Sequence, residues 1–325
     1  FVAFLPMLES DNADLRRLAL QAVARIDPEK AMDYAIEALD DQDFEVKVAA
    51  IRALGTIGDA RALPHLEPLL SQAMLDLHVV AALANIQDPE VGRLLLDLLQ
   101  VNRLRNAALN ALALHDRVAK DLVAEKLATT TEPKHVEGLL QVARLHPSVT
   151  YLSGLEHVLA VNPDRKMEVL DVLAGIEDRE ALLMALSFTL DPTPKIRARA
   201  IQVAGVILEA TGQDDTVDEI IIDALCDQDP QVRLAALQLV ERWRIPGGAK
   251  ILVELMDSPY EQEAVGAAVS LLLVGESYPV PSLVQTLMEG GPHASRAASV
   301  LSEKKPERAL EELVDSLDEI GRAHV

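Results

Sequence analysis

Apolar residues recur along the chain with the period of an amphipathic helix. Between residues 44 and 57 they fall at Val46, Ala49, Ala50, Leu54 and Ile57. This spacing places them on one face of a helix. A short loop with Asp, Pro or Asn separates such a helix from a Leu-rich helix before it, and clear examples of the Leu-rich helix are residues 65–70 and 220–225. The pattern predicts pairs of amphipathic helices.

These pairs form an internal repeat. The segment ALDDQDFEVKVAAIRALGTIGDARALP (Ala38 to Pro64) recurs in related form at residues 7–26, 189–207 and 224–243. The small residues Ala19, Ala50 and Ala81 lie 31 residues apart. We count ten units of about 31 residues, with weaker matches around 94–176. A lone hairpin this small leaves apolar surface exposed, whereas stacked hairpins share a continuous core.

The repeat predicts an all-α fold, a right-handed α-solenoid of about ten hairpins that forms one domain over residues 1–325. Helical periodicity continues to about Ile320, which we interpret as a capping helix over 307–320 or as the cut edge of a longer array. Because the chain begins at Phe1 rather than Met, we expect it to be trimmed or part of a longer protein. Four glycines are predicted to cap second helices at their C-terminal ends: Gly55, Gly58, Gly205 and Gly212.

Composition agrees with thin layers of closely packed helices. Half of the 325 residues are hydrophobic, but only 3% are aromatic. Because aromatic rings normally supply much of the buried area in a globular core, this core must be filled by Leu, Ala, Val and Ile.

The repeat resembles HEAT-like repeats, in particular the short kind named after phycobilisome lyases. The matching residues are LDDQDFEVKVAAIRALGTIGD (Leu39 to Asp59) and CDQDPQVRLAALQLV (Cys226 to Val240). The resemblance extends over nearly the whole chain. It implies a superhelix whose concave surface is lined by the second helix of each pair. The family includes scaffolds, chaperones, regulators and a few enzymes, so the match is specific for fold rather than for function.

Three units carry an acid and a base six residues apart: Asp41 and Lys47, Asp191 and Arg197, Asp227 and Arg233. The resemblance implies that these residues form a structural ladder between neighbouring repeats. Each acid also stands beside a predicted helix start, where it can accept backbone amide protons. A charged binding stripe is the alternative interpretation. In the ninth unit the basic position holds Glu263, which we expect to break the ladder.

The exposed face of the second helices is the candidate partner-binding surface. The repeat register places eight side chains there: Arg17, Gln21, Arg25, Arg52, Thr56, Gln202, Gln238 and Arg242. None is acidic, although the chain holds 52 acidic and 30 basic residues and a formal charge of −22. We expect such a surface to bind an acidic helix or tail of a protein partner. A solvated face with incidental arginines is the alternative.

The sequence offers no motif for catalysis, and we predict no catalytic residue, cofactor or metal ligand. The eight histidines form neither an HExxH pair nor a Cys–His metal spacing. Deoxyhypusine hydroxylase, which shares this fold class, relies on His-Glu dipeptides, and this chain has none. A phycobilin lyase-like subunit remains a minor alternative, since those lyases share the repeat type.

Charge and cysteine usage limit the partners and the compartment. The strong acidity argues against nucleic acid and an anionic membrane surface, because binding phosphates requires clustered Lys and Arg. No apolar stretch reaches the length of a membrane span. The single Cys226 fits a reducing compartment, so a cytoplasmic location is expected. We therefore predict a non-enzymatic scaffold or adaptor, and the alternative is a regulatory or assembly module of a longer enzyme or transporter.

Overall fold

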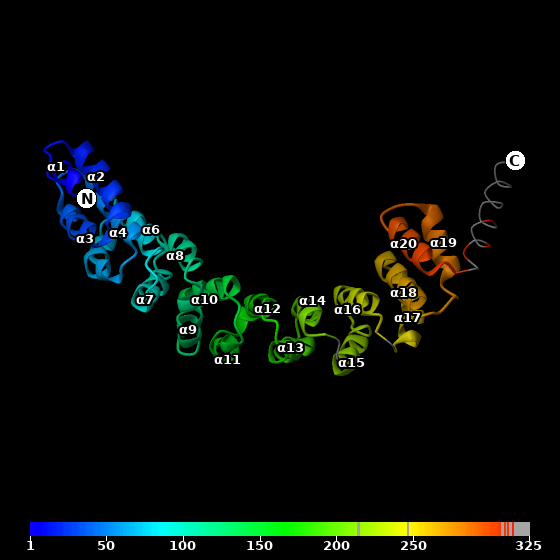
Figure 1. The fold of residues 1–325 in the computed structure, drawn as a ribbon. Helices are drawn as coiled ribbons and strands as arrows, with labels where there is room; N and C mark the ends of the chain where they lie inside the picture. The colour runs from blue at the N-terminus through cyan, green and yellow to red at the C-terminus, as the bar shows by residue number, and fades with distance from the viewer. Residues whose placement is uncertain (213–214, 246, 307–308, 310, 312–313, 315–325) are drawn as a thin grey trace. The chain divides into compact units, whose positions relative to one another are not determined.

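The computed structural model consists of paired α-helices (Figure 1). It describes residues 1–212, 215–245 and 247–306, with 309, 311 and 314, apart from the side chains of 116–118 and 215. No strand occurs among these residues. The capping helix predicted over 307–320 lies outside the described part of the chain. The contacts divide the protein into two compact units, the N-terminal unit (Phe1–Gly175) and the C-terminal unit (Ile176–Val325).

The N-terminal unit holds six helix pairs. Its first helices are α1 (Leu5–Leu8), α3 (Pro28–Glu37), α5 (Leu63–Leu66), α7 (Pro89–Leu98), α9 (Asp116–Leu127) and α11 (Leu152–Val161). Its second helices are α2 (Ala13–Ile26), α4 (Phe44–Ile57), α6 (Asp76–Leu83), α8 (Arg105–Leu112), α10 (Pro133–Leu145) and α12 (Lys166–Leu173). Each second helix contacts the next, from α2 to α12. Short 3₁₀ turns extend several first helices or precede them: η1 (Val2–Phe4), η2 (Ala38–Asp40), η3 (Ala60–Ala62), η4 (Glu67–Ser71), η5 (Val149–Tyr151) and η6 (Pro163–Arg165).

The described residues of the C-terminal unit form four helix pairs. The first helices are α13 (Arg179–Leu186), α15 (Asp215–Ala224), α17 (Ala249–Met256) and α19 (Val280–Glu289), with η7 (Ser187–Leu190) after α13. The second helices are α14 (Pro194–Thr211), α16 (Pro230–Trp243), α18 (Glu261–Leu273) and α20 (Ala294–Lys304). Again each second helix contacts the next. The six and four pairs agree with the ten units counted from the sequence.

Local sequence fixes where the second helices begin. The Asp43 carboxylate accepts hydrogen bonds from the amides of Glu45 and Val46, which caps the start of α4. Asp229 caps α16 in the same way. Such caps satisfy amide protons that have no partner inside the helix, and each stabilises the helix by about 1 kcal/mol.

Two of the four glycines predicted as C-terminal caps have that role, and two do not. Gly58 ends α4 with a φ of 73°, and Gly212 ends α14 with a φ of 87°. The prediction was wrong for Gly55 and Gly205, which are buried inside α4 and α14. A Cβ atom on Gly55 would lie 2.7 Å from the Cα of Ala82. Gly55 therefore lets α4 and α6 approach closely.

The core lies between the stacked helices and is made almost wholly of Ala, Leu, Val and Ile. Tyr151 is the largest fully buried side chain. Its hydroxyl donates a 2.8 Å hydrogen bond to the carbonyl of His146, so burial of this ring leaves no polar group unsatisfied. The scarcity of aromatic residues thus follows from the thinness of the layers.

Candidate interaction surface

Charged rungs join neighbouring repeats and hold the second helices in register. In the N-terminal unit, Arg16 Nε and Nη2 each donate a 2.8 Å hydrogen bond to the carboxylate of Asp41, one repeat later. Arg197 of α14 binds Asp227 in the same bidentate manner, at 2.7 Å for both bonds. The pKa of each carboxyl is lowered, first of all by the hydrogen bond from its arginine.

Each arginine of these rungs also binds the loop of its own repeat. Arg197 Nη1 donates to the carbonyl of Asp191 at 2.9 Å, and Arg233 Nη1 donates to that of Asp227 at 2.7 Å. The acids in turn accept from backbone amides two residues later: Asp191 from Thr193 and Asp227 from Asp229, both at 2.8 Å. Loop and helix are thereby fixed together on both sides of each rung.

The rungs differ from the sequence prediction at two positions. Glu263, which we expected to break the ladder, is only 1% exposed and accepts a 2.9 Å bond from Arg233. Glu263 occupies the position that holds a base in other repeats. Its carboxylate accepts the hydrogen bonds of Arg233 from the preceding repeat. Lys47 makes no hydrogen bond or ion pair within the described residues. Asp76, one repeat further, is bound instead by Arg103.

Sequence reasoning missed two arginines of this series, Arg16 and Arg105. Arg105 donates to the carbonyl of Leu99 at 2.8 Å and faces Glu137 across 3.9 Å. Both were missed because the search required an acid six residues before the base. In the first unit that position holds Ser10, whose backbone carbonyl accepts from Arg16 equally well. A search by helix register would have found them.

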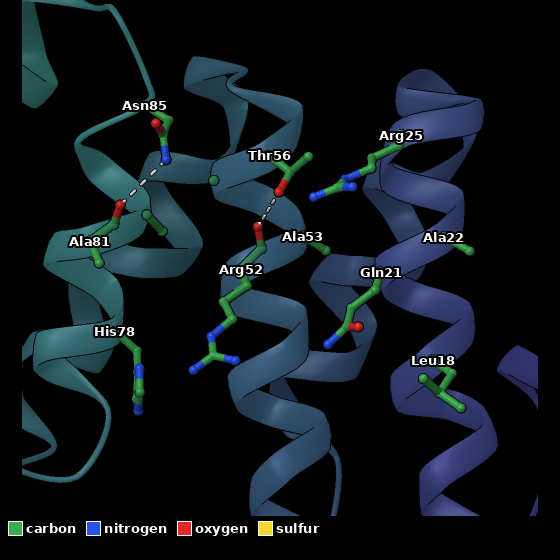
Figure 2. Close-up of a pocket in the computed structure, with 12 residues that line it drawn as sticks. Leu18, Gln21, Ala22, Arg25, Arg52, Ala53, Thr56, His78, Ala81 and Asn85 are labelled. Atoms are coloured by element: carbon green, nitrogen blue, oxygen red, sulfur yellow. Dashed lines mark hydrogen bonds between the residues drawn. The ribbon is translucent and has the colours of Figure 1, made fainter. Parts of the chain in front are cut away.

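A groove with a volume of about 610 Å³ lies over α2, α4 and α6 of the N-terminal unit. We call it the N-terminal groove. Its twelve lining residues are Leu18, Gln21, Ala22, Arg25, Arg52, Ala53, Gly55, Thr56, His78, Ala81, Ala82 and Asn85. Four of the predicted surface residues therefore share one site: Gln21, Arg25, Arg52 and Thr56. The small side chains form its floor, and the longer polar ones project from its walls (Figure 2).

The cationic side chains lie on both sides of α4. Figure 2 shows Arg25 extending from α2 toward Thr56, and Arg52 extending from α4 on the side that faces His78 of α6. Neither arginine makes an ion pair with any described residue. None of the lining residues is acidic. The groove is therefore a region of positive charge in a protein with a formal charge of −22.

Thr56 and Asn85 already bond to their own helices. The Thr56 hydroxyl donates to the carbonyl of Arg52 at 2.9 Å, and the Asn85 amide contacts the carbonyl of Ala81 at 3.5 Å. Neither bond occupies the guanidinium of Arg52 or that of Arg25. The two guanidinium groups therefore remain the strongest unoccupied hydrogen-bond donors of the groove.

The other predicted surface residues lie outside the groove. Arg17 forms a 3.3 Å ion pair with Asp14 of its own helix. In the C-terminal unit, Gln202 accepts a 3.5 Å contact from Arg199, Gln238 is exposed, and Arg242 forms a 2.9 Å ion pair with Glu209. The face of the second helices in the C-terminal unit thus contains an acid, Glu209, that the repeat register did not predict.

The described residues include no group of three or more His, Cys, Asp or Glu side chains that could hold a metal ion. Within the described ranges, no helix is long and apolar enough to cross a membrane. The groove offers guanidinium, amide, hydroxyl and imidazole groups above an alanine-rich floor. These groups suit the recognition of an anionic ligand.

The stacked hairpins and their ladder define an α-solenoid, and comparisons with known proteins agree with this fold. Residues 2–76 match the family model described as HEAT repeats. No curated protein matches the chain. The solved structure of Kap121p aligns with 99% of this chain at 13% identity and a TM-score of 0.54. This likeness shows a shared fold alone, and the chain spans only 45% of Kap121p.

Two further solved structures align over most of the chain but superpose poorly. An engineered protein has a TM-score of 0.39 at 18% identity, covering 96% of this chain and 98% of its own. The complex of CpcE and CpcF of phycocyanin lyase from Nostoc sp. PCC7120 has a TM-score of 0.28 at 18% identity, covering 93% of each chain. Scores this low support no conclusion about activity.

Proposed function

We propose that this protein is a non-enzymatic scaffold or adaptor that binds a partner protein through the N-terminal groove. The observation that carries the proposal is the gathering of Gln21, Arg25, Arg52 and Thr56 from two helices into one concave site. Stacked repeats commonly bind partners on such a surface, because each repeat adds a few contacts to a rigid, extended face.

The composition of the groove also supports binding rather than chemistry. Its polar groups are well suited to hold a ligand by hydrogen bonds and charge. A catalytic site would bring a nucleophile or a general base into contact with a group that orients it. In the N-terminal groove His78 is the one side chain of the lining that commonly acts as a base.

The ladder gives the groove the rigidity that recognition requires. Arg16 of α2 is fixed to Asp41, which precedes α4, and Gly55 allows α4 and α6 to pack closely. The three helices therefore present their side chains with little freedom. A preorganised surface loses less entropy on binding than a mobile one.

Site-specific photo-crosslinking tests this function. A photoreactive amino acid replaces Gln21, which is exposed in the groove, or Asp33, which is exposed on α3 outside it. Cell extracts of the source are then irradiated with the full chain, and crosslinked proteins are identified by mass spectrometry. We expect one protein to be enriched by the Gln21 probe over the Asp33 probe. Equal labelling from both positions would contradict binding at the groove.

A further inference from the structure

The inference below rests on the proposed function and concerns the chemistry of the partner. We propose that the N-terminal groove binds an acidic segment of a partner protein, which lies across α4 with one carboxylate on Arg25 and another on Arg52. The segment is a short acidic run in which small or apolar residues separate the Asp or Glu residues.

Charge complementarity is the first argument. Arg25 and Arg52 are exposed and have no ion pair among the described residues, and the lining holds no acid. Most arginines elsewhere in the described chain face an acid, as Arg16, Arg197 and Arg233 do in the ladder. A guanidinium group binds a carboxylate through two parallel hydrogen bonds, which is the strongest contact these side chains offer.

The spacing of the two arginines is the second argument. They project on opposite sides of α4 (Figure 2), so a ligand that meets both must cross this helix. Neighbouring helices pack about 8–10 Å apart. A segment in the polyproline II conformation advances about 3.1 Å per residue and brings every third side chain back to the same face. Carboxylates three residues apart in such a segment therefore lie about 9 Å apart on one face and match the two positions.

The floor explains why apolar residues belong between the acids. Of the small lining residues, Ala81 is exposed and Ala22 is half-buried, and Leu18 on the wall is 48% exposed. A methyl or isobutyl group of the ligand buries this surface when the carboxylates are bound. Burial of apolar area contributes about 25 cal/mol per Å², so the floor adds affinity that charge alone does not supply.

The overall charge of −22 does not oppose this mode of binding. At physiological ionic strength, interactions between exposed charges are largely screened beyond about 8 Å. The lining of the groove is free of acids, so the nearest charges that the ligand meets are positive. Nucleic acid fits less well, because its binding requires neutralisation of several phosphates along a basic surface, and the groove supplies two arginines.

Fluorescence anisotropy with a defined probe tests the inference. The probe is a short labelled peptide of repeated Glu-Glu-Leu, and a peptide of repeated Lys-Lys-Leu is the charge control. We expect the full chain to bind the acidic peptide and not the basic one. The double variant Arg25→Glu/Arg52→Glu should weaken binding by about tenfold or more, because each substitution replaces an attractive charge by a repulsive one.

A matched variant separates the groove from net charge. Arg61→Glu/Arg93→Glu changes the charge by the same amount, but both arginines are exposed, lie outside the groove and are already paired with acids. We expect it to retain affinity within about twofold of the unsubstituted chain, since exposed pairs contribute little. An equal loss in both double variants would overturn the inference. Circular dichroism confirms that all variants fold.

Two further outcomes distinguish this inference from the proposed function. If the acidic peptide fails to bind while the photoreactive probe at Gln21 still captures one partner, the acidic partner is refuted and the scaffold function stands. If a single-stranded oligonucleotide binds more tightly than the peptide and depends on the same two arginines, the ligand is a nucleic acid and the inference is overturned.

Discussion

The two units carry the same kind of arginine on the same kind of helix face, but in different electrostatic surroundings. In the N-terminal unit, Arg25 and Arg52 have no ion pair among the described residues. In the C-terminal unit, Arg242 of α16 binds Glu209 of α14 at 2.9 Å. An arginine that already has a carboxylate partner offers less to an acidic ligand.

The carboxylate that pairs with Arg242 comes from the last turn of the preceding second helix. The α2 helix ends at Ile26, and Asp27 after it binds Lys30 at 2.8 Å. The α14 helix instead continues to Thr211, and the additional turn carries Glu209 to the face of Arg242. The position of an arginine within a repeat therefore does not decide whether it can bind a partner. In the C-terminal unit an acid in the last turn of the neighbouring helix decides it.

The largest effect is expected from filling the close helix contact in the floor of the N-terminal groove. A Cβ on Gly55 would clash with the backbone of Ala82, whereas a Cβ on Gly205 would meet the end of the Leu239 side chain. Backbone cannot yield as a side chain can, so Gly55→Ala should destabilise the protein by about 2–3 kcal/mol and Gly205→Ala by clearly less. Urea denaturation measures both. A larger loss for Gly205→Ala would show that the contact in α14 is the tighter one.

A smaller loss is expected when a rung of the ladder is removed. Asp227→Ala leaves Arg197, whose side chain is largely covered, without its bidentate partner, and this should cost about 1–2 kcal/mol. Glu209→Ala removes a carboxylate from the exposed pair with Arg242 and should cost less than about 0.5 kcal/mol. Urea denaturation compares the two variants. Equal losses of stability would mean that the more buried Arg197–Asp227 pair stabilises the protein no more than the exposed Arg242–Glu209 pair does.

Buried histidines give the two units a different response to acid. His115 and His135 are buried in the N-terminal unit, and burial lowers the pKa of both side chains. No histidine is buried among the described residues of the C-terminal unit. Because the folded pKa lies below the unfolded value, the unfolded chain binds more protons in weakly acidic solution. Stability is full above the unfolded pKa of about 6.5 and declines as the pH falls below it.

Hydrogen exchange on the full chain measures this difference unit by unit. We expect amide protection to fall between pH 7.5 and pH 5.5 more in α8 and α10 than in α14 and α16, after correction for the intrinsic exchange rate. The variant His115→Gln keeps a donor for the carbonyl of Leu83, which the imidazole contacts at 3.2 Å, but does not titrate. This variant should reduce the difference in amide protection between the two units. An equal decline in both units would contradict the assignment to the buried histidines.

The sequence predicted the repeat, the helix pairs and the direction of most surface side chains, because apolar periodicity fixes which face of a helix is buried. Contacts between repeats were harder to predict. The role of Gly55 depends on how closely α6 approaches, and a glycine near the end of a periodic segment is equally typical of a cap. The acceptor role of Glu263 depends on Arg233 thirty residues earlier. The apolar periodicity of a single helix does not tell how close Gly55 lies to Ala82 or Glu263 to Arg233.

The smallest effect is expected from releasing the paired arginine of the C-terminal unit. Glu209→Gln keeps the size of the side chain and removes the carboxylate that binds Arg242. If the pairing of this arginine is what distinguishes the two faces, the variant should gain a weak second site for the Glu-Glu-Leu peptide. A gain of about twofold is expected in the affinity that remains when Arg25 and Arg52 are both replaced by Glu. Anisotropy titrations in that background measure the gain. The quadruple variant in which Arg242 is also replaced by Glu is the control, and it should lose the gain. If Glu209→Gln has no effect in that background, the alanine floor and the close packing of α4 and α6, rather than the free arginines, set the N-terminal groove apart.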